Sequence, residues 1–197
     1  MEPFESAVVY HYAQGIQDQY NKGGSGHEGE ILWLSAVLLA AGLYAAVPRG
    51  NSPTKDEQEI RALEDRFVAA VKAKDVEAIM KGYAPGAELF VFDVVPPRQY
   101  VGFDAYEKDW QEFFAGFPGP IDQFELTDLS VTTEGKLGYG HSIQHLIATG
   151  KDGSKKDLTV RVTDCYRKID GKWLITREHV SVPVDLGTGK ADLTSKP

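Results

Sequence analysis

The chain has 197 residues and a formal net charge of −8, with 42% hydrophobic and 25% charged residues. These values are typical of one globular domain with an additional segment, and they exclude a disordered or fibrous chain. We expect no nucleic-acid partner, because binding phosphates requires clustered Lys and Arg. The single cysteine, Cys165, excludes an internal disulfide and any site that needs several cysteines.

The first 53 residues differ from the rest. Residues 1–30 are polar and Gly-rich toward their end, which predicts a flexible tail. Residues 31–48 predict an apolar helix outside the domain, and their uncharged stretch 31–47 is just long enough to span a bilayer. Two interpretations stay open. A signal or membrane anchor, with a misassigned start codon as one variant, predicts an exported or membrane-attached protein, whereas a helix buried on the domain or on a partner fits the cytoplasm.

From residue 54 the pattern predicts helix, helix, strand and helix. A capping box at Thr54 and Glu57 begins the first helix, which runs to about Ala73. Its apolar face consists of Ile60, Leu63, Phe67 and Val71. Asp75 caps a shorter second helix that ends before Pro85-Gly86, and a β-rich strand follows over 89–95. A second capping box, Asp104 and Glu107, begins the third helix.

After Pro120, long strands alternate with turn dipeptides at Glu134-Gly135, Asp152-Gly153 and Asp170-Gly171. Strands of this length do not stay flat, so the meander should curl around the helices. The sequence therefore predicts an α+β domain over 54–186, in which a cone-shaped, curved antiparallel sheet wraps about three helices and encloses a cavity. Residues 187–197 are expected to form a C-terminal tail.

If each dipeptide is the tip of a two-residue hairpin, the strand register follows, and one sheet face carries a polar row. That row is Asp128, His141, Asp164 and Arg177. Two neighbouring rows on the same face are mostly apolar. One of them contains His145 and Ser181, and the other contains His179. Because an antiparallel sheet turns its more apolar face to the core, we expect His179 to face a covered interior.

Three residues are candidate catalytic groups. Asp93 ends an apolar strand, where burial would raise its pKa and make it a usable base; alternatively, it caps the turn before Pro96-Pro97. His141 beside Asp128 and Asp164 suits a general base, or these groups form a buried ion-pair ladder with Arg177. His179 is either catalytic or a hydrogen-bonded core histidine.

Further side chains are expected to contact a substrate. They are Asp164, Arg177, His145, Asp128, Tyr166, Tyr139, Trp110 and Ser181. His145 and Trp110 also fit a purely structural role in the core. No metal site is expected, because His141 and His145 lie ~13 Å apart along one strand and no third ligand converges on them. We expect no cofactor either.

The order of elements, with Asp170-Gly171-Lys172-Trp173 leading to Glu178-His179-Val180-Ser181-Val182-Pro183, resembles the nuclear transport factor 2-like superfamily. Within it, the chain is similar to the SnoaL-like, ketosteroid-isomerase-homologue branch over about residues 54–186. The resemblance implies a cone-shaped pocket, frequent homodimers through the outer sheet face, and activities from isomerase to cyclase to none.

The resemblance also bears on individual residues. Asp93 is similar to the isomerase base, although a gapless match places that base at Val91, and Asp164 matches the acid that stabilises the oxyanion. Phe67 stands where the isomerases have a tyrosine, which disfavours steroid isomerisation. The function that follows is proton transfer of isomerase, cyclase or lyase type on a small apolar substrate, with Asp93 or His179 as base and Arg177 stabilising negative charge. The alternative is a non-catalytic ligand-binding or homodimeric association module.

Overall fold

The computed structural model describes residues 52–195. The predicted flexible tail over 1–30 and the predicted apolar helix over 31–48 lie outside the described residues, and so does the membrane attachment through 31–47. Within 52–195, no helix has both the length and the apolar character that a membrane crossing requires.

Helix α2 (Lys55–Ala73) begins at the predicted capping box. The Thr54 amide donates to Glu57 Oε2 at 2.8 Å, and the Glu57 amide donates to Thr54 Oγ1 at 3.2 Å. All four predicted apolar positions of this helix are buried. One charged side chain, Glu64, is buried on the same face and is only 2% exposed.

The two shorter helices are α3 (Val76–Met80) and α4 (Phe103–Gly116). Asp75 caps α3 as predicted, by accepting the Ala78 amide at 2.9 Å. The capping box predicted at Asp104 is wrong, because the N-cap of α4 is Gly102, two residues earlier, and the helix has no side-chain cap. Gly102 has φ +91° and donates its amide to the Leu89 carbonyl at 2.8 Å, a conformation that favours glycine.

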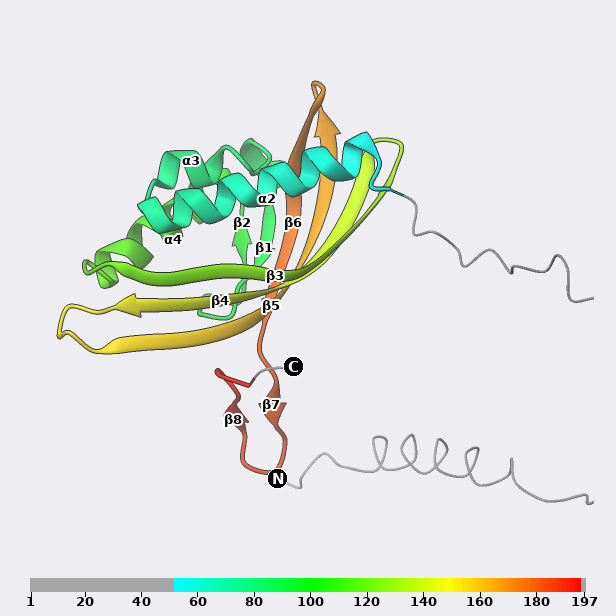
Figure 1. The fold of residues 1–197 in the computed structure, drawn as a ribbon. Helices are drawn as coiled ribbons and strands as arrows, with labels where there is room; N and C mark the ends of the chain where they lie inside the picture. Colours follow the sequence, from blue (N-terminus) through cyan, green and yellow to red (C-terminus); the bar gives the residue numbers. More distant parts are fainter. Residues whose placement is uncertain (1–51, 196–197) are drawn as a thin grey trace, which may run out of the picture. The chain divides into compact units, whose positions relative to one another are not determined.

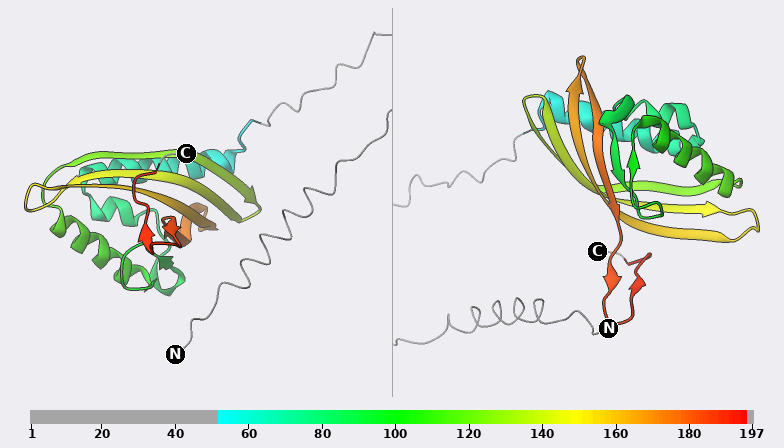
Figure 2. Two further views of the ribbon diagram at one scale, coloured as in Figure 1. Left: turned by 90° about the horizontal axis from the view of Figure 1, so that it is seen from below. Right: turned by 180° about the vertical axis from the view of Figure 1, so that it is seen from behind.

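The main sheet has six strands in the order β2-β1-β6-β5-β4-β3. The strands are β1 (Phe90–Phe92), β2 (Tyr100–Val101), β3 (Ile121–Glu134), β4 (Leu137–Thr149), β5 (Lys155–Ile169) and β6 (Lys172–Ser181). All neighbours are antiparallel except β1 and β6, so the sheet is mixed. It twists around the three helices, which cover its concave face (Figures 1 and 2). The predicted α+β cone is confirmed.

The β5–β6 hairpin keeps its predicted register only near the turn. Tyr166 lies opposite Ile175 as predicted, but Cys165 lies opposite Arg177 and leaves Thr176 as an extra residue in β6. Such a bulge reverses the inward and outward sides of the strand beyond it. Asp164 is therefore opposite Glu178, and the predicted pairing of Asp164 with Arg177 is wrong.

The other two hairpins also depart from the predicted register. Strands β4 and β5 are joined through residues 150–154, so His141 lies opposite Thr163 instead of Asp164. Strand β3 carries a bulge at Asp128, which has φ +53°, and His141 lies opposite Ser130 instead of Asp128. The predicted row of facing acids and histidine therefore does not form.

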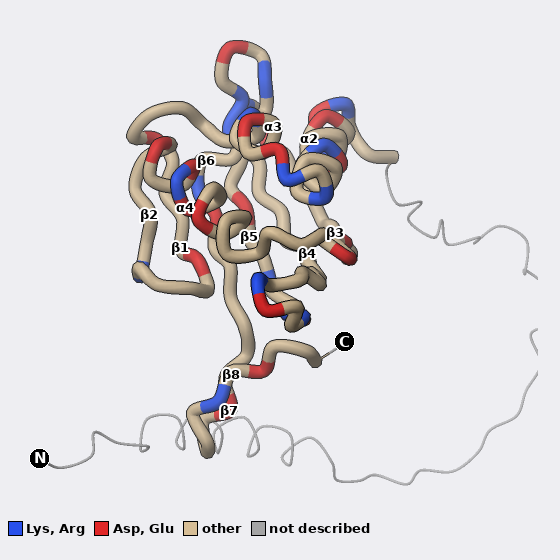
Figure 3. The backbone as a smooth tube through the Cα atoms, turned by 90° about the vertical axis from the view of Figure 1, so that its left-hand side faces the viewer, with Lys and Arg blue, Asp and Glu red and all other residues tan. Residues whose placement is uncertain are grey.

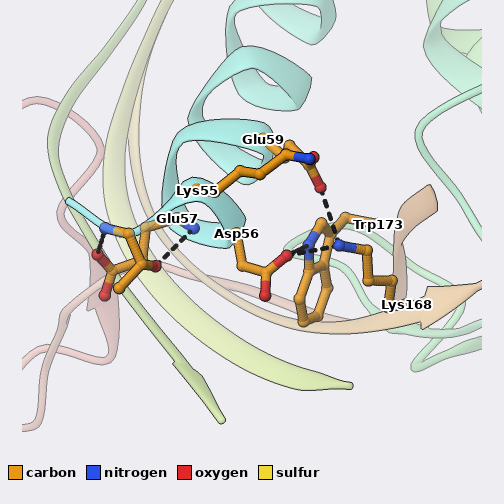
Figure 4. A network of polar contacts seen from close by, with 7 residues as sticks. Lys55, Asp56, Glu57, Glu59, Lys168 and Trp173 are labelled. Atoms are coloured by element: carbon orange, nitrogen blue, oxygen red, sulfur yellow. Dashed lines mark hydrogen bonds and ion pairs between the residues drawn. The ribbon is translucent and has the colours of Figure 1, made fainter. Parts of the chain in front are cut away.

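A polar network fastens the start of α2 to the β5–β6 hairpin (Figure 4). Lys168 Nζ lies 2.5 Å from Asp56 Oδ1 and 3.1 Å from Glu59 Oε2. The Trp173 indole N–H donates to the same Asp56 oxygen at 3.1 Å. Charged residues of both signs lie along α2 (Figure 3). At the start of the helix, Asp56 and Glu59 bind Lys168 of the hairpin.

The C-terminal residues, expected as a tail, contain a second small sheet. Strands β7 (Val184–Asp185) and β8 (Lys190–Ala191) form an exposed antiparallel ribbon, whose turn includes Gly189 at φ +68°. Beyond β8, the Leu193 carbonyl accepts the Thr159 amide of β5 at 2.7 Å. The chain end is thus bonded back to the main sheet.

Candidate functional site

A cavity of about 220 Å³ lies on the concave side of the sheet. Its apolar lining comes from Phe67, Val71, Val94, Val95, Phe113, Phe124, Leu146, Leu158, Val160 and Val180. Three acids, Asp93, Asp109 and Glu178, line it together with the amide of Gln144. An apolar wall that carries a few polar groups is typical of a site for small molecules.

Asp93 follows β1 and, as predicted, shares the buried side of that segment with Leu89 and Val91. Burial, and then the nearby charge of Asp109, raise the pKa of its carboxyl group. One oxygen, Oδ1, accepts the Val94 amide at 2.5 Å and the Val95 amide at 3.4 Å. Asp93 therefore caps the turn and lines the cavity, so its two predicted roles are compatible.

Glu178 is the most enclosed acid of the cavity wall, with 5% of its surface exposed. The hydroxyl of Tyr106 donates to Oε1 at 2.6 Å, and that of Tyr83 donates to Oε2 at 2.8 Å. Burial raises the pKa of Glu178 to about 7 against these hydrogen bonds, which lower it. Glu178 can thus exchange a proton near neutral pH.

Trp110 and Gln144 also line the cavity. Trp110, a predicted substrate contact, packs against Phe67 with ring centroids 5.8 Å apart. Its buried indole N–H has no hydrogen-bond partner among the described residues. A buried donor without a partner is costly, so an acceptor oxygen on a bound molecule would be favourable here.

A second layer of acids lies behind Glu178. Asp164 faces Glu178 across β5 and β6 and is 3% exposed. Burial, followed by the charges of Glu178 and Glu64, raises the pKa of Asp164 well above its usual range. The Tyr166 hydroxyl donates to Glu64 Oε1 at 2.8 Å and lies 3.5 Å from Asp164 Oδ2. Asp164 and Tyr166 are therefore interior residues, but neither lines the cavity.

The predicted histidines lie on the outer face of the sheet. His179 is exposed because of the β6 bulge, and its ring packs edge-on against Phe92 with centroids 5.7 Å apart. His141 is exposed because the longer β4–β5 connection shifts its register. His145 is half-buried, and its ring nitrogens contact Gln123 at 3.3 Å and Asp157 at 2.8 Å. The expectation that His179 faces the interior is wrong.

The remaining predicted contacts also lie away from the cavity. Arg177 is exposed opposite Cys165, and its guanidinium donates to the Thr176 carbonyl at 2.7 Å and to the Glu88 carbonyl. Tyr139 is 58% exposed, and Asp128 is exposed at the β3 bulge. Ser181 is half-buried opposite Arg161. In the described part of the chain, no cluster of three or more His, Cys, Asp or Glu could hold a metal ion.

Sequence reasoning missed three acids, two tyrosines and an amide that the structure brings together. The acids are Glu64, Asp109 and Glu178, the tyrosines are Tyr83 and Tyr106, and the amide is that of Gln144. Glu64 carried a signal, because it lies four residues after Ile60 and three before Phe67 on the apolar helix face. Glu178 carried none, because a bulge that leaves one residue unpaired has no clear sequence signature here.

The fold and the apolar cavity define a pocket protein of the α+β cone class. The SnoaL-like domain family matches residues 60–185, and the chain belongs to this family. An NTF2-like protein of unknown function from Pseudomonas putida KT2440 is 32% identical, with a TM-score of 0.64. That match covers 72% of this chain and 96% of the other.

Two more distant similarities complete the comparison. A putative dehydratase of the NTF2-like family from Streptomyces avermitilis is 18% identical, with a TM-score of 0.58, over 66% of this chain and 97% of that one. The 26S proteasome non-ATPase regulatory subunit 7 of Dictyostelium discoideum is 28% identical over 112 residues, or 52% of this chain. The match spans only 30% of that curated relative.

Proposed function

We propose that the protein is an enzyme that moves a proton on a small, largely apolar molecule bound in the cavity. The observation that carries the proposal is the presence of two acids with raised pKa, Asp93 and Glu178, on the wall of one apolar cavity. Titratable groups shifted by burial inside a pocket are typical of acid–base sites.

In the proposed reaction, Asp93 is the base. Its Oδ1 is held by two backbone amides, which leaves Oδ2 for the substrate. Glu178 is the acid, because a carboxyl group with a pKa of about 7 is partly protonated at neutral pH. The Trp110 indole N–H, which lacks a partner, would donate to a substrate oxygen. Substrates with a carbonyl or hydroxyl oxygen on an apolar frame fit this set of groups.

Elimination of water is one reaction of this class. It needs a base that removes a proton from carbon and an acid that protonates the departing hydroxyl, and the two carboxyl groups of the cavity could divide these tasks. The structural neighbour from Streptomyces avermitilis bears the name of a putative dehydratase, which is consistent with lyase chemistry. Isomerisation uses the same two steps on one molecule.

The test is deuterium uptake, which reports proton abstraction without knowledge of the product. The full chain is incubated in D₂O with a panel of small apolar ketones, such as tetralones and cyclohexenones, and mass spectrometry follows the exchange of C–H for C–D. Asp93→Asn should slow the exchange by about 100-fold or more, because it removes the base. Asp128→Asn makes the same chemical change at an exposed bulge and should have no effect.

If the ketones bind but neither protein exchanges deuterium, the protein is a ligand-binding module without this chemistry. If Asp93→Asn exchanges as fast as the unchanged chain, Asp93 is not the base.

We further propose that two copies associate through the outer sheet face. Large apolar side chains are exposed there, including Tyr139 (58%), Leu137 (59%) and Phe92 (42%). Apolar groups gathered on one face favour association with a matching surface. Sedimentation of the full chain should show a dimer that Tyr139→Glu weakens, and a monomer at all concentrations would contradict the proposal.

A further inference from the structure

Three buried carboxyl groups lie inside the cone, and Glu178 is the one that lines the cavity. The other two, Glu64 and Asp164, are not part of the reaction proposed above. Within residues 52–195, no Lys, Arg or His side chain is hydrogen-bonded to any of the three. Their interior partners are tyrosine hydroxyls and one another.

Glu64, Tyr166 and Asp164 form a chain of hydrogen-bonding atoms that ends beside Glu178. Tyr166 Oη donates to Glu64 Oε1 at 2.8 Å and lies 3.5 Å from Asp164 Oδ2. Asp164 and Glu178 are paired across β5 and β6, so their buried side chains lie next to each other on the inner face of the sheet. Asp164 Oδ1 has no hydrogen-bond partner among residues 52–195 and is available to take part in proton exchange.

The two ends of this chain reach different places. Glu178 lines the cavity together with Asp93, whose charge adds to burial in raising the pKa of Glu178. Glu64 lines a separate groove between α2 and β3, beside Asp65 and Lys72. The carboxyl chain therefore links the cavity to a second opening, behind the sheet and helix.

We propose that Glu64, Tyr166 and Asp164 form a proton path between the α2–β3 groove and Glu178. This path returns a proton to Glu178 while a ligand fills the cavity. The proposal rests on the proposed function, in which Glu178 gives a proton to the bound molecule. Asp164 then passes its proton to Glu178, Tyr166 passes one to Asp164 and takes one from Glu64, and Glu64 takes one from water in the groove. One proton enters and one leaves, and no other bond changes.

Two further observations support the path. Burial raises the pKa of both Glu64 and Glu178 to about 7, so moving a proton from one to the other costs little free energy. The other partners of Glu178 do not offer a route to the groove, because the Tyr83 and Tyr106 hydroxyls are buried and bond to Glu178, and neither tyrosine lines the groove.

The test measures hydrogen–deuterium exchange of the buried protonated carboxyl groups by the infrared C=O band, after rapid mixing of the full chain with D₂O. Asp164→Asn identifies the band of Asp164. Naphthalene, which is apolar and has no exchangeable proton, fills the cavity. The variants are Glu64→Gln and Tyr166→Phe, and the matched control is Asp65→Asn, which removes a charge from the same helix and groove without touching Tyr166.

With naphthalene bound, Glu64→Gln and Tyr166→Phe should exchange about tenfold more slowly than the unchanged chain, and Asp65→Asn should not. Without naphthalene all four proteins should exchange alike, because water enters through the cavity. A purely structural role predicts equal or faster exchange, since a loosened core admits water, and either result would overturn the path. Failure of naphthalene to bind would overturn the proposed function together with the path, whereas binding with unchanged exchange would overturn the path alone.

Discussion

The two faces of the curved sheet carry the same kinds of polar residue in opposite circumstances. Glu178 and His179 are neighbours in β6, yet Glu178 is buried among tyrosines and His179 is exposed. The inner face collects acids whose pKa is raised by burial, while the outer face carries histidines and arginines that reach water. The comparison teaches that the face on which a residue lies, more than its type, decides its chemistry.

The largest expected effect on stability comes from adding an acid to the inner face of the sheet. Val162 is buried between Ser142 and Val180, next to Asp164, and Val162→Asp would add a fourth carboxyl group to the cluster. We expect a loss of about 4 kcal/mol or more in the free energy of unfolding, because burying an unpaired charge is among the costliest changes. Urea unfolding at pH 7 measures it.

The matched control is Thr163→Asp, one residue further along β5 on the exposed face. It should change the free energy of unfolding by about 0.5 kcal/mol or less. Equal losses in the two variants would mean that the faces are not distinct.

The second expected effect is a fall in stability with rising pH. The pKa of Glu178 is about 7 in the folded chain and 4.5 as its ordinary value, so the folded state retains a proton that the unfolded state releases over this range. Stability is therefore lost as pH rises from 5 to 8, by roughly 3 kcal/mol for this group at 1.36 kcal/mol per pH unit. The shifts of Glu64 and Asp164 have the same sign.

Urea unfolding at pH 5 and pH 8 checks this prediction. Glu178→Gln should remove part of the difference between the two pH values, since the amide does not titrate. Glu125→Gln, at an exposed position of β3, should leave the difference unchanged. A difference that persists in full in Glu178→Gln would show that Glu178 titrates normally in the folded chain.

The sequence was sufficient for the fold because the fold depends on local and repeated patterns. The capping box at Thr54, the apolar stripe of α2 and the Asp170-Gly171 turn each act over a few residues, and the structure has all of them. The curvature followed from strand length alone. The parallel pairing of β1 with β6 brings together strands distant in the chain, which no local pattern encodes.

The site was less predictable because it depends on which strand residues point to the inner face and which point to the outer face. A single unpaired residue, Thr176, whose hydroxyl donates to the Cys165 carbonyl at 3.1 Å, reverses the rest of β6. The β3 bulge at Asp128 and the longer β4–β5 connection shift the pairing of His141. The places of Asp93 and Trp110 on the cavity wall do not depend on hairpin register, because Asp93 follows β1 and Trp110 lies within α4.

The smallest expected effect is the one that most sharply tests the division between the faces. His179→Gln removes the imidazole of an exposed side chain that packs against the Phe92 ring. Because His179 lies on the outer face, its loss should not change the rate of deuterium uptake by ketones, while Asp93→Asn slows uptake by about 100-fold or more. Mass spectrometry measures the uptake, and urea unfolding on the same preparations shows that each variant is folded. A large loss of uptake in His179→Gln would require the imidazole to reach the cavity, which needs a β6 without its bulge, and Glu178 would then lie outside and could not be the acid.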